Sequence, residues 1–383
     1  MKRKWISLFL TAVMLLSAAG CGTPVAVQEP AEQASAETAV LPGNGATHIV
    51  EDHAGNQIEV PYEINRIAVC DIYPIPSVLA IFFDSAEKIV GMAGPSMVAA
   101  KNSLLGELYP ELLNAETGYI SGTTVNTEEL MALNPDVVFY SATQKEQGEQ
   151  LRNAGFAAVA ISVNKWGYNA IETLDNWMKL FDELFPGNAR GQIVTEYSEK
   201  IYNMVQDRVK DIPNEDREKV FFLFQYSDTA LMTSGKQFFG QWWADAIGAV
   251  NAAEELEKDN SVSVSMEQVY AWDPTLIFIT NFTSAYPEDL YGNTVGSYDW
   301  SAVSAVQNQR VYKMPLGMYR SYTAGVDTPV TLLWLAKSAY PERFADIDMT
   351  REVRDYYQTV FGVELTDEQV GRIFTPTAEA SAF

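Results

Sequence analysis

Residues 187–211 read GNARGQIVTEYSEKIYNMVQDRVKD, and this stretch decides how the rest of the chain is divided. Its apolar side chains recur at helical spacing and predict one amphipathic helix. The predicted apolar stripe consists of Ile193, Tyr197, Ile201, Met204, Val205 and Val209. Asn188 is a favourable N-cap, and Pro213 lies beyond the other end. At about 1.5 Å per residue this helix spans roughly 33 Å, which is enough to connect two compact bodies.

An internal repeat flanks this helix. Residues 127–140 read TEELMALNPDVVFY, and residues 266–279 read MEQVYAWDPTLIFI. Each segment predicts a short helix, a proline that ends it and a buried strand. Two similar half-chains therefore lie on either side of the helix.

Strands and helices alternate through both half-chains, which predicts an α/β fold with two lobes. Each lobe is expected to be a mostly parallel sheet covered by helices on both faces. We expect a signal peptide (1–21) and a disordered tether (22–46) before the first lobe (47–186). The inter-lobe helix (187–212) then leads to the second lobe (213–374), which is followed by a disordered tail (375–383).

The composition excludes some partners. The chain has 383 residues, of which 47% are hydrophobic, so each lobe can bury a sizeable core. Lys and Arg number 26 against 50 Asp and Glu, and the formal net charge is −24. Such a chain repels nucleic acids and anionic bilayers.

The N-terminus has the pattern of a targeting segment. A basic start, Lys2 to Lys4, precedes a short apolar run and the small residues 17–20 before Cys21. Residues 17–21 resemble a bacterial lipobox, which implies lipidation at Cys21 and a protein held on the outer face of the cytoplasmic membrane. An ordinary cleaved signal with an incidental cysteine is the alternative.

The few cysteines and histidines indicate neither a disulfide nor a metal centre. With Cys21 lipidated, Cys70 has no partner, and its strand pattern predicts a small buried hydrophobe. The only histidines, His48 and His53, lie in a predicted hairpin without a carboxylate cluster. A surface position is therefore preferred to a metal site for both.

Several segments, taken in the order in which they occur along the chain, resemble those of one protein family. In the first half they are EDHAGNQIEVP (51–61), RIAV (66–69) and EELMALNPDVVF (128–139). In the second half they are VFFLFQYSDTALMTSGKQFF (220–239), SMEQVYAWDPTLIFIT (265–280) and WSAVSAVQNQRVYKMP (300–315). Together they resemble the substrate-binding proteins of ABC importers for ferric siderophores, haem and cobalamin.

This resemblance implies a type III solute-binding protein, with two α/β lobes, one long connecting helix and a ligand in the cleft between the lobes. It also implies a partner, an ABC permease dimer with its ATPase. Glu128 and Glu267 hold matching places in the repeat and would dock on the permease, with Glu129 as an alternative. A carboxylate at a helix start also favours the helix dipole, so capping is an equal explanation for both.

Loops at the carboxyl ends of the strands would supply the ligand site. The candidates are aromatic residues with a few polar donors, as suits a broad, partly apolar metal chelate or tetrapyrrole. They are Tyr73, Met92, Ser96, Thr143, Trp166, Tyr226, Lys236, Phe238, Trp242, Asn281, Tyr319, Arg320 and Tyr322. No cofactor is expected, and Arg320 could meet an anionic group of the ligand.

The expected function is capture of an iron chelate, a ferric siderophore, and its delivery to the permease, without enzymatic activity. A corrinoid or haem receptor of the same importer class is the first alternative. A receptor for zinc or manganese would need clustered histidines and carboxylates, which the sequence lacks. A secreted lipid-anchored hydrolase is the alternative from another class, although a histidine base and a Gly-x-Ser-x-Gly motif are not evident.

Overall fold

The computed structural model describes residues 45–188 and 190–381. The predicted signal peptide, the lipidation at Cys21 and all but the last two residues of the predicted tether lie outside these described residues. Within the described ranges, no helix combines the length and the apolar composition needed to cross a membrane.

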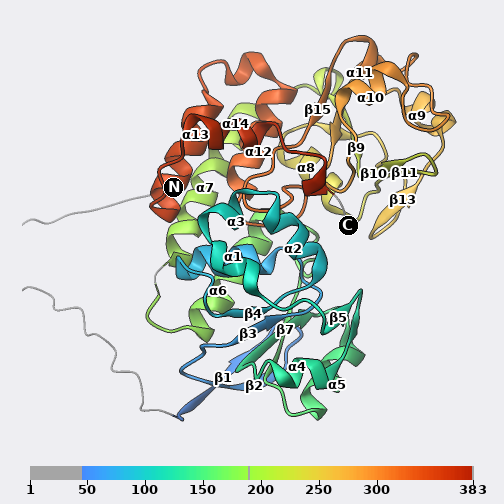
Figure 1. Cartoon of the computed structure of the whole chain (residues 1–383). Helices are drawn as coiled ribbons and strands as arrows, with labels where there is room; N and C mark the ends of the chain where they lie inside the picture. Colours follow the sequence, from blue (N-terminus) through green and yellow to red (C-terminus); the bar gives the residue numbers. More distant parts are fainter. Residues whose placement is uncertain (1–44, 189, 382–383) are drawn as a thin grey trace, which may run out of the picture. The chain divides into compact units, whose positions relative to one another are not determined.

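The first lobe is built on a four-stranded parallel sheet in the order β4-β3-β7-β8 (Figure 1). Its strands are β3 (Ile67–Val69), β4 (Ile89–Gly91), β7 (Val137–Ser141) and β8 (Ala158–Ile161). Two small antiparallel hairpins accompany it, β1 (Thr47–Glu51) with β2 (Gln57–Pro61) and β5 (Ile120–Ser121) with β6 (Thr124–Val125). The helices are α1 (Ile75–Phe83), α2 (Gly94–Lys101), α3 (Leu104–Leu108), η1 (Pro110–Asn114), α4 (Thr127–Ala132), α5 (Lys145–Asn153) and α6 (Ala170–Leu184).

The second lobe repeats this sheet in the order β12-β9-β14-β15, again parallel. Its strands are β9 (Lys219–Leu223), β12 (Val250–Asn251), β14 (Leu276–Ile279) and β15 (Val311–Lys313). Its α-helices are α8 (Phe239–Ala246), α9 (Met266–Trp272), α10 (Pro287–Gly292), α11 (Ser304–Gln307), α12 (Thr328–Ala339), α13 (Met349–Tyr356) and α14 (Asp367–Phe374). Shorter turns are η2 (Asn214–Asp216), η3 (Pro341–Phe344), a π-helical turn η4 (Tyr357–Phe361) and η5 (Glu379–Ser381).

The internal repeat is confirmed as α4 followed by β7 and as α9 followed by β14. The Asn126 side chain caps α4, and Ser265 forms a capping box with Gln268 at the start of α9. Every residue of β7 and of β14 is buried, as expected for central parallel strands covered on both faces. The predicted α/β class with two mostly parallel sheets is therefore correct.

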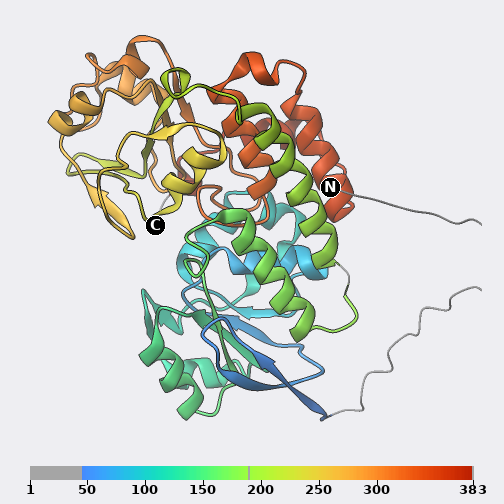
Figure 2. The same ribbon diagram turned by 180° about the vertical axis from the view of Figure 1, so that it is seen from behind.

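The long helix is α7 (Arg190–Val209), which at about 1.5 Å per residue is roughly 30 Å long. It packs against α6 of the first lobe and α12 of the second, and Figure 2 shows α6 and α7 as neighbouring green helices. The predicted stripe is wrong at one member, because Ile193 is 40% exposed. Val194 is buried instead and continues the face of Tyr197 and Ile201.

Two features were not predicted from the sequence. In the second lobe, β10 (Gln225–Ser227) and β11 (Ala230–Ser234) join β13 (Ser261–Ser263) in a separate antiparallel sheet. The tail, expected to be disordered, ends in η5 with Ala380 and Ser381 buried. Residues 382–383 lie outside the described residues.

Candidate functional site

The two sheets share one strand order, in which the first strand of each lobe lies between the second and the third. In open α/β sheets of this kind, ligands bind beyond the carboxyl ends of the strands at the point where the order reverses. In the first lobe this point lies between β3 and β7, and in the second between β9 and β14. The loops that follow these strands, together with the loop after β15, form the candidate site.

Arg320 lies at the centre of the second lobe's contribution, in the loop between β15 and α12. Its side chain is only 1% exposed, and the guanidinium lies 5.0 Å from the centre of the Phe282 ring. Its Nε donates to the carbonyl of Ala380 at 3.3 Å. Burial lowers the pKa of Arg320, while the nearby phenols of Tyr319 and Tyr73 act in the opposite direction. Because arginine is so basic, the group stays positively charged.

Lys313 is a second buried basic group within electrostatic reach of Arg320. Its Nζ donates to the carbonyls of Thr280, Thr283 and Ala285 at 2.9, 2.5 and 3.0 Å. Burial first, and then the charge of Arg320, lower the pKa of Lys313 to about 7. The second lobe therefore buries two basic groups at this edge, which the composition of a chain with net charge −24 does not suggest.

Other candidates of the second lobe support this edge. Asn281 donates to the carbonyl of Met314 and accepts from the backbone of Ser321, so it holds the loop beside Arg320. Within the described part of the chain, the buried Tyr319 hydroxyl has no hydrogen-bond partner. The ring of Tyr322 is fully buried and packs against the ring of Phe238.

The first lobe contributes groups that are tied to its own backbone. Asp71, directly after β3, accepts from the backbone N–H of Ser141 at 2.9 Å, and burial raises its pKa. The Ser96 hydroxyl donates to the carbonyl of Tyr73 at 2.8 Å. Tyr73 itself is half-buried; burial and the Asp71 carboxylate raise its pKa, whereas Arg320 lowers it. Tyr73 of the first lobe therefore lies within electrostatic reach of Arg320 of the second.

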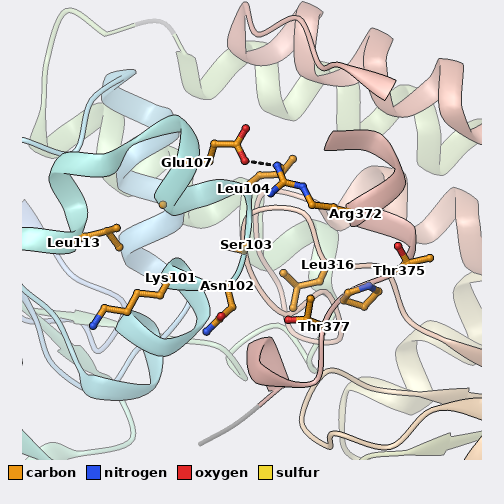
Figure 3. A pocket seen from close by; sticks show the side chains of 12 residues that line it. Lys101, Asn102, Ser103, Leu104, Glu107, Leu113, Leu316, Arg372, Thr375 and Thr377 are labelled. Atoms are coloured by element: carbon orange, nitrogen blue, oxygen red, sulfur yellow. Dashed lines mark hydrogen bonds and ion pairs between the residues drawn. The ribbon is translucent and has the colours of Figure 1, made fainter. Parts of the chain in front are cut away.

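Several contacts join the lobes around this place. In the first lobe, the backbone N–H of Leu104 donates to the carbonyl of Gly317 in the second. Glu107 of α3 forms an ion pair with Arg372 of α14. Leu104, Glu107 and Arg372 line a hollow of about 380 Å³ that Figure 3 shows between α2–α3 and the segments around Leu316 and Thr375.

Trp166 does not join this group. It packs edge-on against His53 within the first lobe and lines a separate pocket on α6. Tyr168, two residues later, reaches the second lobe instead, where its hydroxyl donates to the carbonyl of Asp259 and its ring contacts Phe238. Sequence reasoning selected the larger aromatic of the loop and missed the one that crosses between the lobes.

Five further candidates lie in other environments. Met92 is fully buried in the core of the first lobe, and Tyr226 is buried in the second lobe, where its hydroxyl accepts from Trp300. Lys236 is exposed and paired with Glu257. The remaining two are Trp242, which packs against Trp243, and Thr143, which is exposed and hydrogen-bonded to Ser141.

The residues that sequence reasoning missed are Lys313, Phe282, Tyr168 and the tail at Ala380. Lys313 reads in the sequence as an ordinary strand residue, and only its burial reveals a role. Both candidate docking residues, Glu128 and Glu267, are exposed in the first turns of α4 and α9, and a hydrogen bond from Ser265 lowers the pKa of Glu267. Their role on a permease stays a prediction.

Among the described residues, His48, His53 and Cys70 form no metal centre. His53 accepts from the backbone N–H of Ser162, His48 stacks on Tyr62, and both are half-buried rather than freely exposed. Cys70 is buried, as predicted. Across residues 45–188 and 190–381, no group of three or more His, Cys, Asp or Glu could hold a metal ion.

Comparison with known proteins shows which family has this architecture. Residues 84–316 match the family model described as periplasmic binding protein. A periplasmic solute binding protein from Veillonella parvula has a similar structure, with a TM-score of 0.77 and 29% identity over 86% of this chain and 97% of that one. A relative from Haemophilus influenzae, the molybdate-binding protein MolA, is 27% identical over 85% of this chain and 94% of its own.

A third relative, an ABC transporter substrate-binding lipoprotein called YvrC from Bacillus subtilis, is 23% identical over 89% of this chain and 98% of its own length. The family match covers more than half of the chain, and the relatives match across both lobes and the connecting helix. The chain therefore belongs to the periplasmic binding protein family and is a substrate-binding protein of an ABC importer.

Proposed function

We propose that this protein captures an anionic metal complex between its two lobes and delivers it to an ABC permease, with a ferric siderophore as the first candidate. The observation that carries the proposal is the burial of two basic side chains, Arg320 and Lys313, with the phenols of Tyr73 and Tyr319 in the electrostatic surroundings of Arg320. Burying positive charge is costly, and a site that binds anions offsets that cost when its ligand arrives.

The aromatic surroundings support a ligand larger than a simple ion. Phe282 lies under Arg320, while Phe238 contacts Phe224 and Tyr168. Flat apolar walls with a few donors suit the ligand shell of a chelate. A carboxylate or hydroxamate oxygen of that shell would accept charge-assisted hydrogen bonds from Arg320.

A free oxyanion such as molybdate is the second candidate. The relative MolA is named for molybdate, and its sequence aligns with both lobes of this chain. Arg320 and Lys313 suit molybdate as well as a chelate, but molybdate would leave the aromatic walls without a role. A corrinoid or haem lacks a comparable supporting observation. The relatives are binding proteins, and no observation on the described residues supports the hydrolase alternative.

The place of action and the partners belong to the same proposal. We infer anchoring through lipid on Cys21, on the outer face of the cytoplasmic membrane, with a permease dimer and its ATPase as partners. The exposed carboxylates Glu128 and Glu267, each at the start of a repeated helix, are the proposed docking groups. Because these two residues hold matching places in the repeat, each lobe would present one carboxylate to the permease.

The test is a titration of the mature chain, residues 22–383, followed by tryptophan fluorescence and calorimetry. The solutes are ferric citrate, a ferric catecholate, ferrichrome, molybdate, haemin and cobalamin. We expect saturable binding of one anionic complex with a dissociation constant of about 1 μM or lower. Arg320→Gln should weaken that binding by about 100-fold, because it removes a desolvated charge from the contact.

Arg351→Gln is the matched control, since Arg351 is exposed on α13 and pairs only locally with Asp355. It should bind like the wild type. Binding of the neutral ferrichrome complex alone, with Arg320→Gln unaffected, would contradict recognition of an anion. Binding of molybdate and of no chelate would select the second candidate.

A further inference from the structure

The C-terminal tail occupies the neighbourhood of Arg320. After α14 the chain continues through Thr375 to Thr377 into η5, where Ala380 and Ser381 are buried. This segment consists mainly of small residues without helical or strand periodicity, and it was expected to be disordered. Its burial therefore comes from contacts with the rest of the chain.

The tail contacts both lobes. In the second lobe, the Tyr286 hydroxyl donates to the carbonyl of Pro376 at 2.7 Å, and Arg320 donates to that of Ala380. In the first lobe, η5 packs against α2. Figure 3 shows Thr375 and Thr377 across the hollow from Lys101 and Asn102 of the first lobe. The tail thus bridges the two lobes at the place where the candidate site lies.

One group that the tail offers to Arg320 is neutral, the carbonyl of Ala380. Hydrogen bonds between arginine and an anionic oxygen are roughly twice as strong as those to neutral acceptors. An anion that reaches the buried guanidinium should therefore replace the carbonyl of Ala380. Because this carbonyl belongs to the short turn η5, its withdrawal disturbs no strand or α-helix.

We propose that the C-terminal tail is an intramolecular occupant of the solute site, held by Arg320 and Tyr286 and displaced when the anionic solute binds. This inference rests on the proposed function, since it assigns regulation to the same site. The tail lowers the apparent affinity of the free protein by the fraction of molecules in which it is docked. It also keeps the buried cations covered while no solute is present.

The experiment compares three full mature proteins: the wild type, Ala380→Arg and Glu379→Arg. Ala380 is buried beside Arg320, so an arginine there introduces both bulk and repulsion. Glu379 is an exposed neighbour and receives the same side chain as a control. Hydrogen exchange followed by mass spectrometry on peptides that cover residues 376–381 reports docking, with and without ferric citrate, the ferric catecholate and molybdate.

Without solute, we expect the tail amides to be protected in the wild type and in Glu379→Arg, and to exchange quickly in Ala380→Arg. A saturating solute should remove the protection in the wild type. Ala380→Arg should bind that solute about tenfold more tightly, as expected when a competing state is removed. Unchanged exchange in peptides from α7 and β14 would show that the variant is folded.

Two results would overturn the inference. Equal, fast exchange in all three proteins without solute would show that the tail is not docked. Protection that persists at saturation, with equal affinities, would make the tail a permanent wall of the site. Failure of all three solutes on every variant would instead reject the proposed solutes, while exchange without solute still decides whether the tail is docked.

Discussion

The two lobes share a strand order but build the ends of their strands differently. In the first lobe, the polar groups at this edge bind the lobe's own backbone, as Asp71 does at Ser141 and Ser96 at Tyr73. In the second lobe, the edge holds two buried basic side chains, Lys313 and Arg320. The two edges therefore differ in the charge they can carry, since the first holds the Asp71 carboxyl and the second holds the two basic groups. Similar topology fixes where a site lies, and the side chains of each edge decide what it binds.

The largest difference between the two lobes is expected in the loss of stability on substitution, and it should be seen with Lys313→Met. It removes the donor from three buried carbonyls, so we expect the unfolding free energy to fall by about 3 kcal/mol. Ser96→Ala, its counterpart in the first lobe, removes one hydrogen bond and should cost about 1 kcal/mol. Urea unfolding followed by tryptophan fluorescence measures both. Equal losses would mean that the two edges depend equally on their polar groups.

The next effect concerns Asp175, on α6 where it faces α7. Burial raises its pKa to about 6, opposed by the hydroxyl of Thr195. Because the folded protein binds this proton more tightly than the unfolded chain, stability should fall as the pH rises from about 4 to 6. Asp175→Asn should therefore be more stable than the wild type at about pH 7, by roughly 1–2 kcal/mol, and similar to it at about pH 4.

Urea unfolding at both pH values measures the Asp175 effect. Glu196→Gln is the control, because Glu196 is an exposed carboxylate on α7. It should leave the pH dependence unchanged. An advantage of Asp175→Asn that is as large in acid as at neutral pH would exclude ionisation of this carboxyl as the cause.

A smaller effect is expected where the lobes meet. Tyr73→Phe removes one phenolic hydroxyl from beside Arg320 and should weaken solute binding by about 5-fold, since a neutral hydrogen bond contributes about 1 kcal/mol. The effect expected for Arg320→Gln is much larger. Calorimetry on both variants with the same solute tests this order. A loss for Tyr73→Phe as large as that for Arg320→Gln would place charge recognition on both lobes.

The smallest effect belongs to the ion pair of Arg208, on α7, with Asp346 in the second lobe. A hydrogen bond from Arg208 lowers the pKa of Asp346 to about 2. The contribution of this pair is present above the ordinary carboxyl pKa and disappears as the pH falls through about 2. Asp346→Asn should lower the melting temperature slightly near neutral pH, and less so in about 1 M salt. A decrease that persists at high salt would argue against a screened surface pair.

Much of the fold follows from local patterns in the sequence. The repeat of a capped helix, a proline and an apolar run gives α4–β7 and α9–β14, because caps and buried parallel strands have strong local signatures. The helical spacing gives α7, although the phase of its stripe places Ile193 wrongly. Which of two adjacent apolar residues is buried depends on how α6 and α12 pack against the helix, and this packing is not local.

The site was predictable in part. Loops after strands could be identified, so Tyr73, Tyr319 and Arg320 were named, but their meeting involves residues nearly 250 positions apart in the chain. Trp166 and Tyr168 share one loop, and the choice between them follows from left-handed backbone at Gly167 and Tyr168, with φ of 60° and 59°. That turn sends Tyr168 toward Phe238 and leaves Trp166 against His53.

The sequence by itself determined the α/β class, the two similar lobes, the connecting helix and the importer family, because these depend on periodicity, capping and segment order. Only the tertiary structure decided that Lys313 is buried beside Arg320 and that the tail lies against both lobes. Burial of a charge and docking of an unpatterned segment depend on surfaces brought together from distant parts of the chain, and such surfaces leave no periodic trace in the residues themselves.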